Sequence, residues 1–151
     1  MQTICATGIR VSELRFITVE SLQDRQAKVA LKGKIRTIIL PKNLCRQLKK
    51  YIRERNIKSG PIFITRNGNP LDRSNICHEM KALSKMSGVS KGKIFPHNLR
   101  HLFACVYYQI EKDLFRLADL LGHSNVNTTR IYTQISSETQ EKQIEMLKLV
   151  I

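Results

Sequence analysis

The chain of 151 residues contains no Trp, and aromatic side chains make up only 6% of it. Proteins that bind single-stranded nucleic acid stack the bases on aromatic side chains, so this scarcity argues against such a module. The chain also lacks an apolar run that approaches the length of a membrane span, and it opens without a signal-peptide pattern. We therefore expect a cytoplasmic protein without a membrane partner.

Cysteine is scarce as well, and its spacing excludes two classes of small domain. The four cysteines are Cys5, Cys45, Cys77 and Cys105, and no two of them form a CxxC pair. This pattern belongs neither to a disulfide framework nor to a zinc ribbon. We expect reduced thiols that are mostly buried.

Acidic residues are few relative to basic ones. Asp and Glu number 12 against 26 Lys and Arg, which gives a formal net charge of +14 and a pI of about 10.0. The excess is concentrated between Arg25 and Lys58, where twelve basic residues accompany a single acid, Glu54. Each Lys or Arg that neutralises a phosphate releases a counterion, so this composition favours a polyanionic partner. The residues after Tyr132 differ, with two Lys and three Glu.

The rest of the composition, 42% hydrophobic and 25% charged, is typical of one globular domain. Alternating apolar residues predict strands at 27–31 and 35–40 around a glycine-centred turn, and a further short strand is expected at 61–64. Helices are expected at residues 11–16, after Pro41, from a Ser74 cap to about 87, after Pro96, from an Asp113 cap to 122, from an Asn125 cap to about 132, and at 136–150. Gly8 is expected to end a preceding helical turn. The predicted fold is therefore α+β, mostly helical with a small antiparallel sheet, in one domain of residues 1–151.

Four motifs follow one another along the chain. They are the segment Thr7-Gly-Ile-Arg10-Val-Ser-Glu13-Leu14, the hairpin tip at Lys32, the segment His97-Asn-Leu-Arg100-His101, and Leu121-Gly-His123 followed nine residues later by Tyr132. Together they resemble the tyrosine recombinases of the phage-integrase family, and the resemblance covers nearly the whole chain. It implies the C-terminal catalytic domain of a site-specific recombinase, without the N-terminal DNA-clamping domain that the family normally carries.

The resemblance implies a strand-transfer reaction on double-stranded DNA that needs no metal or other cofactor. The hydroxyl of Tyr132 attacks a phosphodiester, giving a 3′-phosphotyrosyl bond and a free 5′-hydroxyl, and a 5′-hydroxyl from another strand reverses the step. Negative charge accumulates on two non-bridging oxygens, which the guanidinium groups of Arg10 and Arg100 are suited to bind. Tyrosine has a pKa of about 10, so its proton must be removed or its phenolate stabilised.

Two histidines complete the phosphate site that the resemblance implies. His97 precedes Arg100 by three residues, so both lie on one helix face, and in the family this histidine helps to move the tyrosine proton. In the family the position of His123 donates a hydrogen bond to the phosphate. The acid at the position of Glu13 supports the site, and we expect His101 to pack behind it.

The leaving 5′-oxygen needs a proton, which a lysine at the hairpin tip supplies in the family. We expect Lys32 to be this general acid, because the family hairpin usually reads Gly-Lys-Gly at this point. Here Leu31 replaces the first glycine and the turn is one residue shorter, so Lys34 remains a competitor.

Three other interpretations stay open at this point. His97 and His101 have the spacing of two helical zinc ligands, but the Asn-Leu-Arg between them lacks a Glu base and its arginine repels a cation. A DNA-binding protein without chemistry would place the helix at 74–88 in a groove. A type IB topoisomerase would share the tyrosine chemistry.

The resemblance also implies assembly, because family members act as homo-oligomers, expected here as a tetramer on DNA. The nearly neutral tail at 136–151 carries an apolar stripe of Ile144, Leu147 and Ile151. Either this stripe packs on the core of its own chain, or it docks on a neighbouring protomer.

Overall fold

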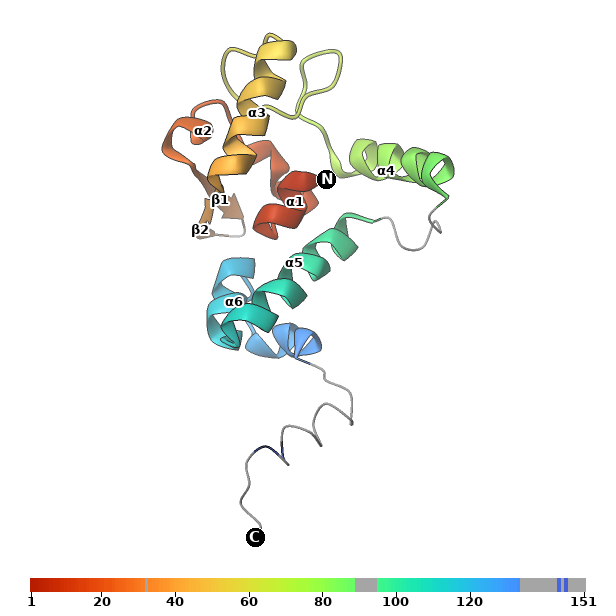
Figure 1. Ribbon diagram of the computed structural model, residues 1–151. Helices are drawn as coiled ribbons and strands as arrows, with labels where there is room; N and C mark the ends of the chain where they lie inside the picture. Colours follow the sequence, from red (N-terminus) through yellow and green to blue (C-terminus); the bar gives the residue numbers. More distant parts are fainter. Residues whose placement is uncertain (32, 89–94, 134–143, 145, 147–151) are drawn as a thin grey trace.

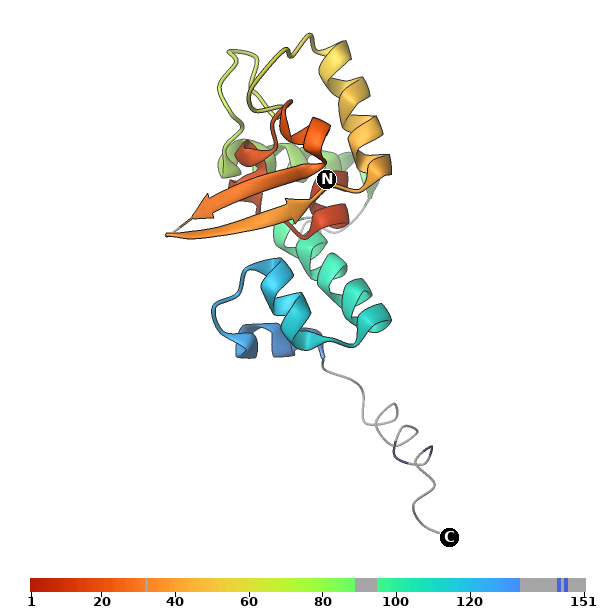
Figure 2. The same ribbon diagram turned by 90° about the vertical axis from the view of Figure 1, so that its left-hand side faces the viewer.

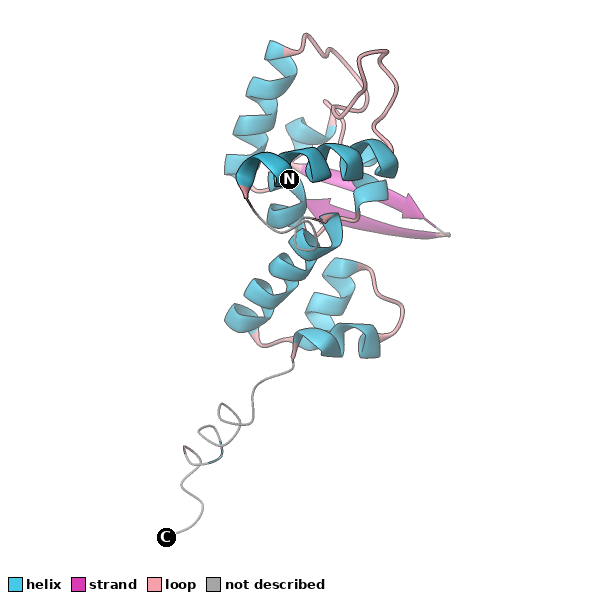
Figure 3. Ribbon diagram, turned by 90° about the vertical axis from the view of Figure 1, so that its right-hand side faces the viewer, coloured by secondary structure: helices cyan, strands magenta, loops and turns pink. Residues whose placement is uncertain are grey.

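Helices dominate the computed structural model, which describes residues 1–31, 33–88, 95–133, 144 and 146 (Figure 1). Within these residues the only sheet is a two-stranded antiparallel one, and Figure 3 shows how small a share of the molecule it forms. The predicted α+β class, mostly helical with a small antiparallel sheet, is confirmed.

The elements follow the expected order with three differences in detail. They are α1 (Gln2–Thr7), the 3₁₀ helix η1 (Val11–Phe16), α2 (Ser21–Asp24), β1 (Gln26–Leu31), β2 (Lys34–Ile39), α3 (Lys42–Glu54), α4 (Arg73–Ser87), α5 (Pro96–Glu111), α6 (Leu114–Leu121) and the 3₁₀ helix η2 (Val126–Tyr132). Helix α2 was not predicted. The cap predicted at Ser74 is wrong, because α4 begins at Arg73 and its N-cap is Asp72, whose side chain accepts from the backbone N–H of Asn75 at 2.7 Å. An aspartate binds these unpaired N–H groups as well as a serine does.

The prediction of a strand at 61–64 is wrong, because this segment does not form a continuous hydrogen-bonded ladder with another strand. Pro61 and Ile64 each form one isolated bridge, to Thr18 and Pro70 respectively. Proline has no N–H to donate, so a strand that begins with it and ends in a tight turn cannot extend its pairing. The segment nevertheless delivers Ile62 to the core with 0% exposure.

The hairpin runs from Gln26, opposite Ile39, to Leu31, opposite Lys34 (Figure 2). Its alternation places Ala27, Val29 and Ile38 in the core. In Figure 2 the two strands extend to one side beyond the helices. Both strands lie within a residue of the predicted ranges, because period-2 alternation determines which residues face the core.

Two clusters of buried side chains form the interior. The larger unites α1, η1, α2, the hairpin and α3, and includes Ile4, Leu22, Val29 and Leu44. The smaller lies between α5, α6 and η2 and consists of Ala104, Leu117, Leu121 and Tyr132. Tyr132 is therefore held by the packing of three helices.

Helix α1 joins the two parts because it packs on α5. Gly8 ends α1 in the left-handed region at φ 62°, as predicted. A Cβ at this position would lie 2.4 Å from Cδ1 of Phe103 on α5, so only glycine fits both the backbone angle and the close approach.

Two further expectations have different outcomes. All four cysteines are free, as expected, but only Cys45 is buried and the other three are half-buried. The tail predicted as a helix at 136–151 lies outside the described residues, apart from Ile144 and Met146, whose side chains are exposed.

Candidate active site

A cleft of about 660 Å³ brings together five of the six predicted catalytic side chains. They are Arg10, His97, Arg100, His123 and Tyr132. The sixth, Lys32, lies outside the described residues. Residues separated by more than a hundred positions in the sequence thus line one cavity, which is the arrangement that cooperative chemistry on one substrate group requires.

Helix ends position most of these side chains. Arg10 is the N-cap residue of η1, and Tyr132 is the last residue of η2. Pro96 occupies the first position of α5, which places exposed His97 in its first turn and buried Arg100 one turn further along the same face. His123 follows Gly122, whose left-handed conformation at φ 66° ends α6. Each terminus aims a side chain at the cleft where the chain changes direction.

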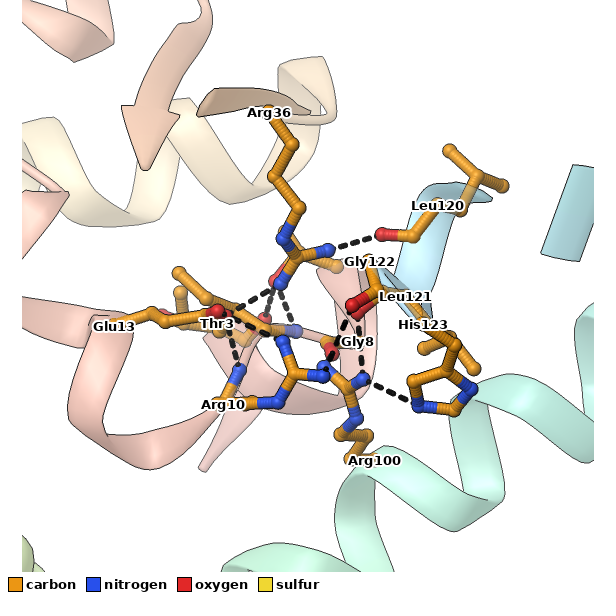
Figure 4. Close-up of polar contacts among 12 residues, drawn as sticks. Thr3, Gly8, Arg10, Glu13, Arg36, Arg100, Leu120, Leu121, Gly122 and His123 are labelled. Carbon is orange, nitrogen blue, oxygen red and sulfur yellow. Dashed lines mark hydrogen bonds and ion pairs between the residues drawn. The ribbon is translucent and has the colours of Figure 1, made fainter. Parts of the chain in front are cut away.

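Three arginines converge on the C-terminal end of α6 (Figure 4). The carbonyls of its last two residues and of its C-cap each accept from a different guanidinium: Leu120 from Arg36, Leu121 from Arg100 at 2.7 Å, and Gly122 from Arg10 at 3.3 Å. Carbonyls at a helix C-terminus have no partner within the helix, and they form the negative end of its dipole. The C-terminal end of α6 therefore holds together three cations that would otherwise repel one another.

Glu13 supplies the one carboxylate of this cluster, and its side chain is only 1% exposed. It accepts from the backbone N–H of Arg10 at 2.8 Å and from Arg10 Nη1 at 3.0 Å, and it also forms an ion pair with Arg36 (Figure 4). Burial alone would raise the pKa of Glu13, but the backbone hydrogen bond and the two arginines outweigh it and hold the pKa below its usual value. The carboxylate is therefore ionised, and it is more than the simple helix-surface partner that spacing alone would allow.

Arg100 is 5% exposed, and the protein engages three of the five N–H donors of its guanidinium. Its Nη1 donates to the carbonyl of Gly8 at 2.6 Å, and its Nη2 lies 2.7 Å from the Leu121 carbonyl and 3.1 Å from Nε2 of His123. Burial, then the charges of Arg10 and Arg36, lower the pKa of Arg100 to about 10. The guanidinium stays charged at neutral pH and is fixed in place before any substrate arrives.

The contacts of His123 determine its tautomer. A guanidinium can only donate, so Nε2 of His123 accepts from Arg100, and the ring proton is on Nδ1, where it donates to Oγ1 of Thr129 at 2.8 Å. Thr129 is completely buried. Burial and the charges of Arg100, Arg10 and Arg36 lower the pKa of His123 to about 4, so the ring is neutral at pH 7.

The shifts of His123 and Glu13 predict that the folded state loses stability in acid. Folded His123 binds its proton near pH 4, whereas an unfolded histidine does so near 6.5, so the unfolded state takes up more protons between these values. Stability should therefore fall as the pH is lowered from 6.5 towards 4. Glu13, whose folded pKa is lowered, adds a further loss below its unfolded value of 4.5.

Urea midpoints measured between pH 7.5 and 4.5 check this expectation. His123→Gln should flatten the upper part of the slope, whereas His78→Gln, a change at an exposed histidine of α4, should leave it unchanged. Equal slopes in the two variants would contradict the assignment to His123.

Tyr132 is 7% exposed, and its ring meets the edge of His101 with centroids 5.0 Å apart and an interplanar angle of 78°. Burial raises the pKa of Tyr132, and the positive charges of Arg100 and Arg10 act against that rise. The phenol is therefore protonated at neutral pH and needs a proton acceptor before it can act as a nucleophile. His101 packs against the tyrosine as expected, and its Nδ1 lies 3.2 Å from Sγ of Cys105.

No group of three His, Cys, Asp or Glu side chains that could hold a metal ion occurs among the described residues. The zinc pair considered as an alternative interpretation therefore has no third ligand among these residues. His101 is already occupied by Cys105 and by the ring of Tyr132. The side chains that line the cleft include guanidinium groups, two imidazoles and a phenol.

Sequence reasoning missed Arg36. It lies on β2 opposite buried Val29 and two residues before buried Ile38, which places it on the inward face of the hairpin. The sequence signal for Arg36 was an arginine at a position where the alternation of the strand predicts an apolar residue. A guanidinium buried there needs carbonyl or carboxylate partners. Arg73 and Cys77 of α4 also line the cleft and were not predicted to do so.

Comparison with known proteins gives one consistent result. The family model described as "Phage integrase family" matches residues 1–139. The tyrosine recombinase XerA of Pyrococcus furiosus is 30% identical over 151 residues, which cover 95% of this chain and 52% of that protein. A crystal structure of XerA recombinase has a TM-score of 0.79 at 28% identity, covering 99% of this chain and 55% of the other. The XerH recombinase bound to its difH substrate in a pre-cleavage complex has a TM-score of 0.76 at 26% identity, covering 99% and 46%.

The chain thus spans about half the length of the curated relatives that it matches. Among the described residues, no helix is both long and apolar enough to cross a membrane.

Proposed function

The chain belongs to the phage integrase family, and from this premise we propose that it is a site-specific recombinase that cleaves and rejoins double-stranded DNA through a 3′-phosphotyrosyl bond at Tyr132. The observation that carries the proposal is the convergence of two arginines, two histidines and a tyrosine on one cleft. Separate motifs have no reason to share a cavity in a protein that only binds DNA. The excess of basic residues in the segment between Arg25 and Lys58 supports a polyanionic substrate.

In the proposed reaction the oxygen of Tyr132 forms a bond to the scissile phosphorus as the bond to the 5′-oxygen breaks. Arg10 and Arg100 bind the two non-bridging oxygens, on which charge accumulates in the transition state. The pre-formed hydrogen bonds of Arg100 favour this role, since they fix the guanidinium at no further entropic cost. His97, exposed in the cleft, accepts the tyrosine proton. The 5′-hydroxyl of another strand reverses the step, so the bond energy is conserved and no ATP is needed.

His123 must change its hydrogen bonds when a phosphate enters. In the free chain Nε2 accepts from Arg100, so it has no proton to offer. A phosphate oxygen that takes over the Arg100 donor would release Nε2, which can then donate only after the ring proton moves from Nδ1 or a second proton is bound. The anion itself favours such proton uptake, because it opposes the positive charges that lower the pKa of His123.

A suicide substrate tests the proposed function directly. This is duplex DNA nicked beside the scissile phosphate, so that the freed 5′-end diffuses away and the phosphotyrosyl protein accumulates. We expect SDS-stable protein–DNA adducts, and we expect them in EDTA as well, because fixed cations do the work of a metal. No adduct from the unchanged chain would refute the proposal, whereas adducts abolished by EDTA and restored by zinc would revive the metal interpretation.

Lys32 is proposed as the general acid that protonates the leaving 5′-oxygen. In the sequence it follows Leu31, which faces Lys34 as the last pair of the hairpin. Lys34 is the first residue of β2, so its backbone is held by pairing with β1.

We expect Lys32→Ala to slow adduct formation far more than Lys34→Ala, by about 100-fold against a few-fold. A 5′-phosphorothiolate substrate has a leaving group that needs no proton, and it should restore the rate of Lys32→Ala. Rescue of Lys34→Ala instead would assign the acid to that residue.

We further propose that the chain works as a homo-oligomer, a tetramer on two DNA duplexes. Helix α5 presents an apolar stripe to solvent, with Leu102 53%, Val106 45% and Ile110 72% exposed at a spacing of four residues. Such a stripe favours an apolar partner segment, and the sequence of the tail carries Ile144, Leu147 and Ile151 at helical spacing. A tail that leaves one protomer and covers α5 of the next would couple each nucleophile to its neighbour.

A further inference from the structure

Among the residues whose side chains the structure describes, Arg36 is the most enclosed cation that the proposed reaction does not use. It projects from β2 towards the end of α6, its side chain is 15% exposed, and it lies behind the cleft rather than in its lining (Figure 4). Burying a guanidinium is costly unless its donors are satisfied, so its position needs an explanation.

Two contacts hold Arg36 in place, while its Nε is buried without a hydrogen-bond partner among the described residues. Its Nη1 donates to the carbonyl of Leu120, and its Nη2 donates to Oε2 of Glu13 (Figure 4). The other oxygen of Glu13 accepts from Arg10, a cleft residue. Arg36 thus joins two structures that each aim a side chain at the cleft: η1 with Arg10, and the end of α6 with His123.

Gly122 leaves the space that this connection needs. A Cβ at Gly122 would lie 2.7 Å from Cδ and 2.9 Å from Nε of Arg36, so the arginine crosses the helix end against the glycine backbone. The Leu121-Gly-His123 motif therefore serves two purposes at once, since the glycine also allows the left-handed turn that follows α6.

We propose that Arg36 is a positioning residue, which holds Arg10 and His123 in register on one phosphate by tying Glu13 to the end of α6. The inference rests on the proposed function and adds to it a residue that does not touch the phosphate. Without Arg36, the Leu120 carbonyl loses its donor and Glu13 keeps one arginine instead of two. The end of α6 and the start of η1 can then shift relative to each other, and a displacement of about 1 Å at a catalytic group costs on the order of 100-fold in rate.

The test compares Arg36→Gln with Arg116→Gln, which removes one positive charge from the exposed face of α6. Single-turnover adduct formation is measured at saturating suicide DNA, once with a phosphodiester and once with a methylphosphonate at the scissile position. The methyl group removes the negative charge of one non-bridging oxygen, so the transition state depends less on the aim of Arg10 and His123.

On the phosphodiester we expect Arg36→Gln to be about 100-fold slower than the unchanged chain. On the methylphosphonate the difference should shrink below about 10-fold, and Arg116→Gln should stay within about 2-fold on both substrates. A DNA Kd within about 3-fold would show that the loss is one of rate and not of binding. The double variant with Glu13→Gln should be less impaired than the product of the two single deficits, because Arg36 and Glu13 share one contact while Glu13 also holds Arg10 directly.

Arg36→Lys is a second variant, which keeps the test valid if Arg36→Gln does not fold. It keeps the charge but not the planar fork, and we expect a loss of about 10-fold with the same dependence on substrate. An equal deficit on both substrates, rates like that of the unchanged chain, or failure of both variants to fold would overturn the positioning role. These results differ from failure of the proposed function, in which the unchanged chain itself forms no adduct and the inference falls with it.

Discussion

Tyr132→Phe is expected to abolish the SDS-stable protein–DNA adduct while leaving duplex DNA binding within about 2-fold of the original. The change removes one hydroxyl, and only that hydroxyl can form the phosphotyrosyl bond. The fold should persist, because the ring keeps its place between α5, α6 and η2 and its edge contact with His101. Adducts are measured on SDS gels with the suicide substrate, and binding is measured by gel shift at low salt.

Tyr108→Phe is the matched control. Tyr108 is half-buried on α5 and packs against the same small cluster as Tyr132, so it tests the loss of a tyrosine hydroxyl near the site without touching the nucleophile. We expect normal adduct yields from it. Undiminished adducts from Tyr132→Phe would mean that another residue attacks the phosphate, and the assignment would have to be abandoned.

Arg100→Lys is expected to reduce the single-turnover rate by about 100- to 1000-fold, although the charge is retained. A lysine ammonium is a point charge and cannot bind a phosphate through two parallel donors while also bonding two carbonyls. The carbonyls of Gly8 and Leu121 would lose good partners in a buried place, so we also expect a destabilisation of about 2 kcal/mol.

Two measurements separate these effects. Urea unfolding reports the stability change, and rates at a temperature where the variant is fully folded report the chemistry. Arg116→Lys, at an exposed position of α6, is the control and should change neither the stability nor the rate. A rate for Arg100→Lys within about 3-fold of the original would show that Arg100 serves the fold alone.

Much of the site could be predicted because local patterns determine where helices end. Pro96 starts α5, so the spacing of three residues predicts that His97 and Arg100 share a face. Gly122 ends α6 and places His123 at a helix terminus. The errors arose where several residues compete for the same role, as when Asp72 rather than Ser74 caps α4.

The sequence alone determined the fold class, the hairpin and the chain positions of the reactive groups, because periodicity, glycines and caps act over a few residues. Only the tertiary structure decided how the cations are held. Arg36, Arg100 and Arg10 lie far apart in the chain and reach consecutive carbonyls of α6. The tautomer of His123 and the burial of Glu13 follow from that meeting and not from any neighbour in sequence. The physical reason is that hydrogen bonds and desolvation depend on distances in space. The packing of the helices sets these distances, and residue spacing along the chain does not.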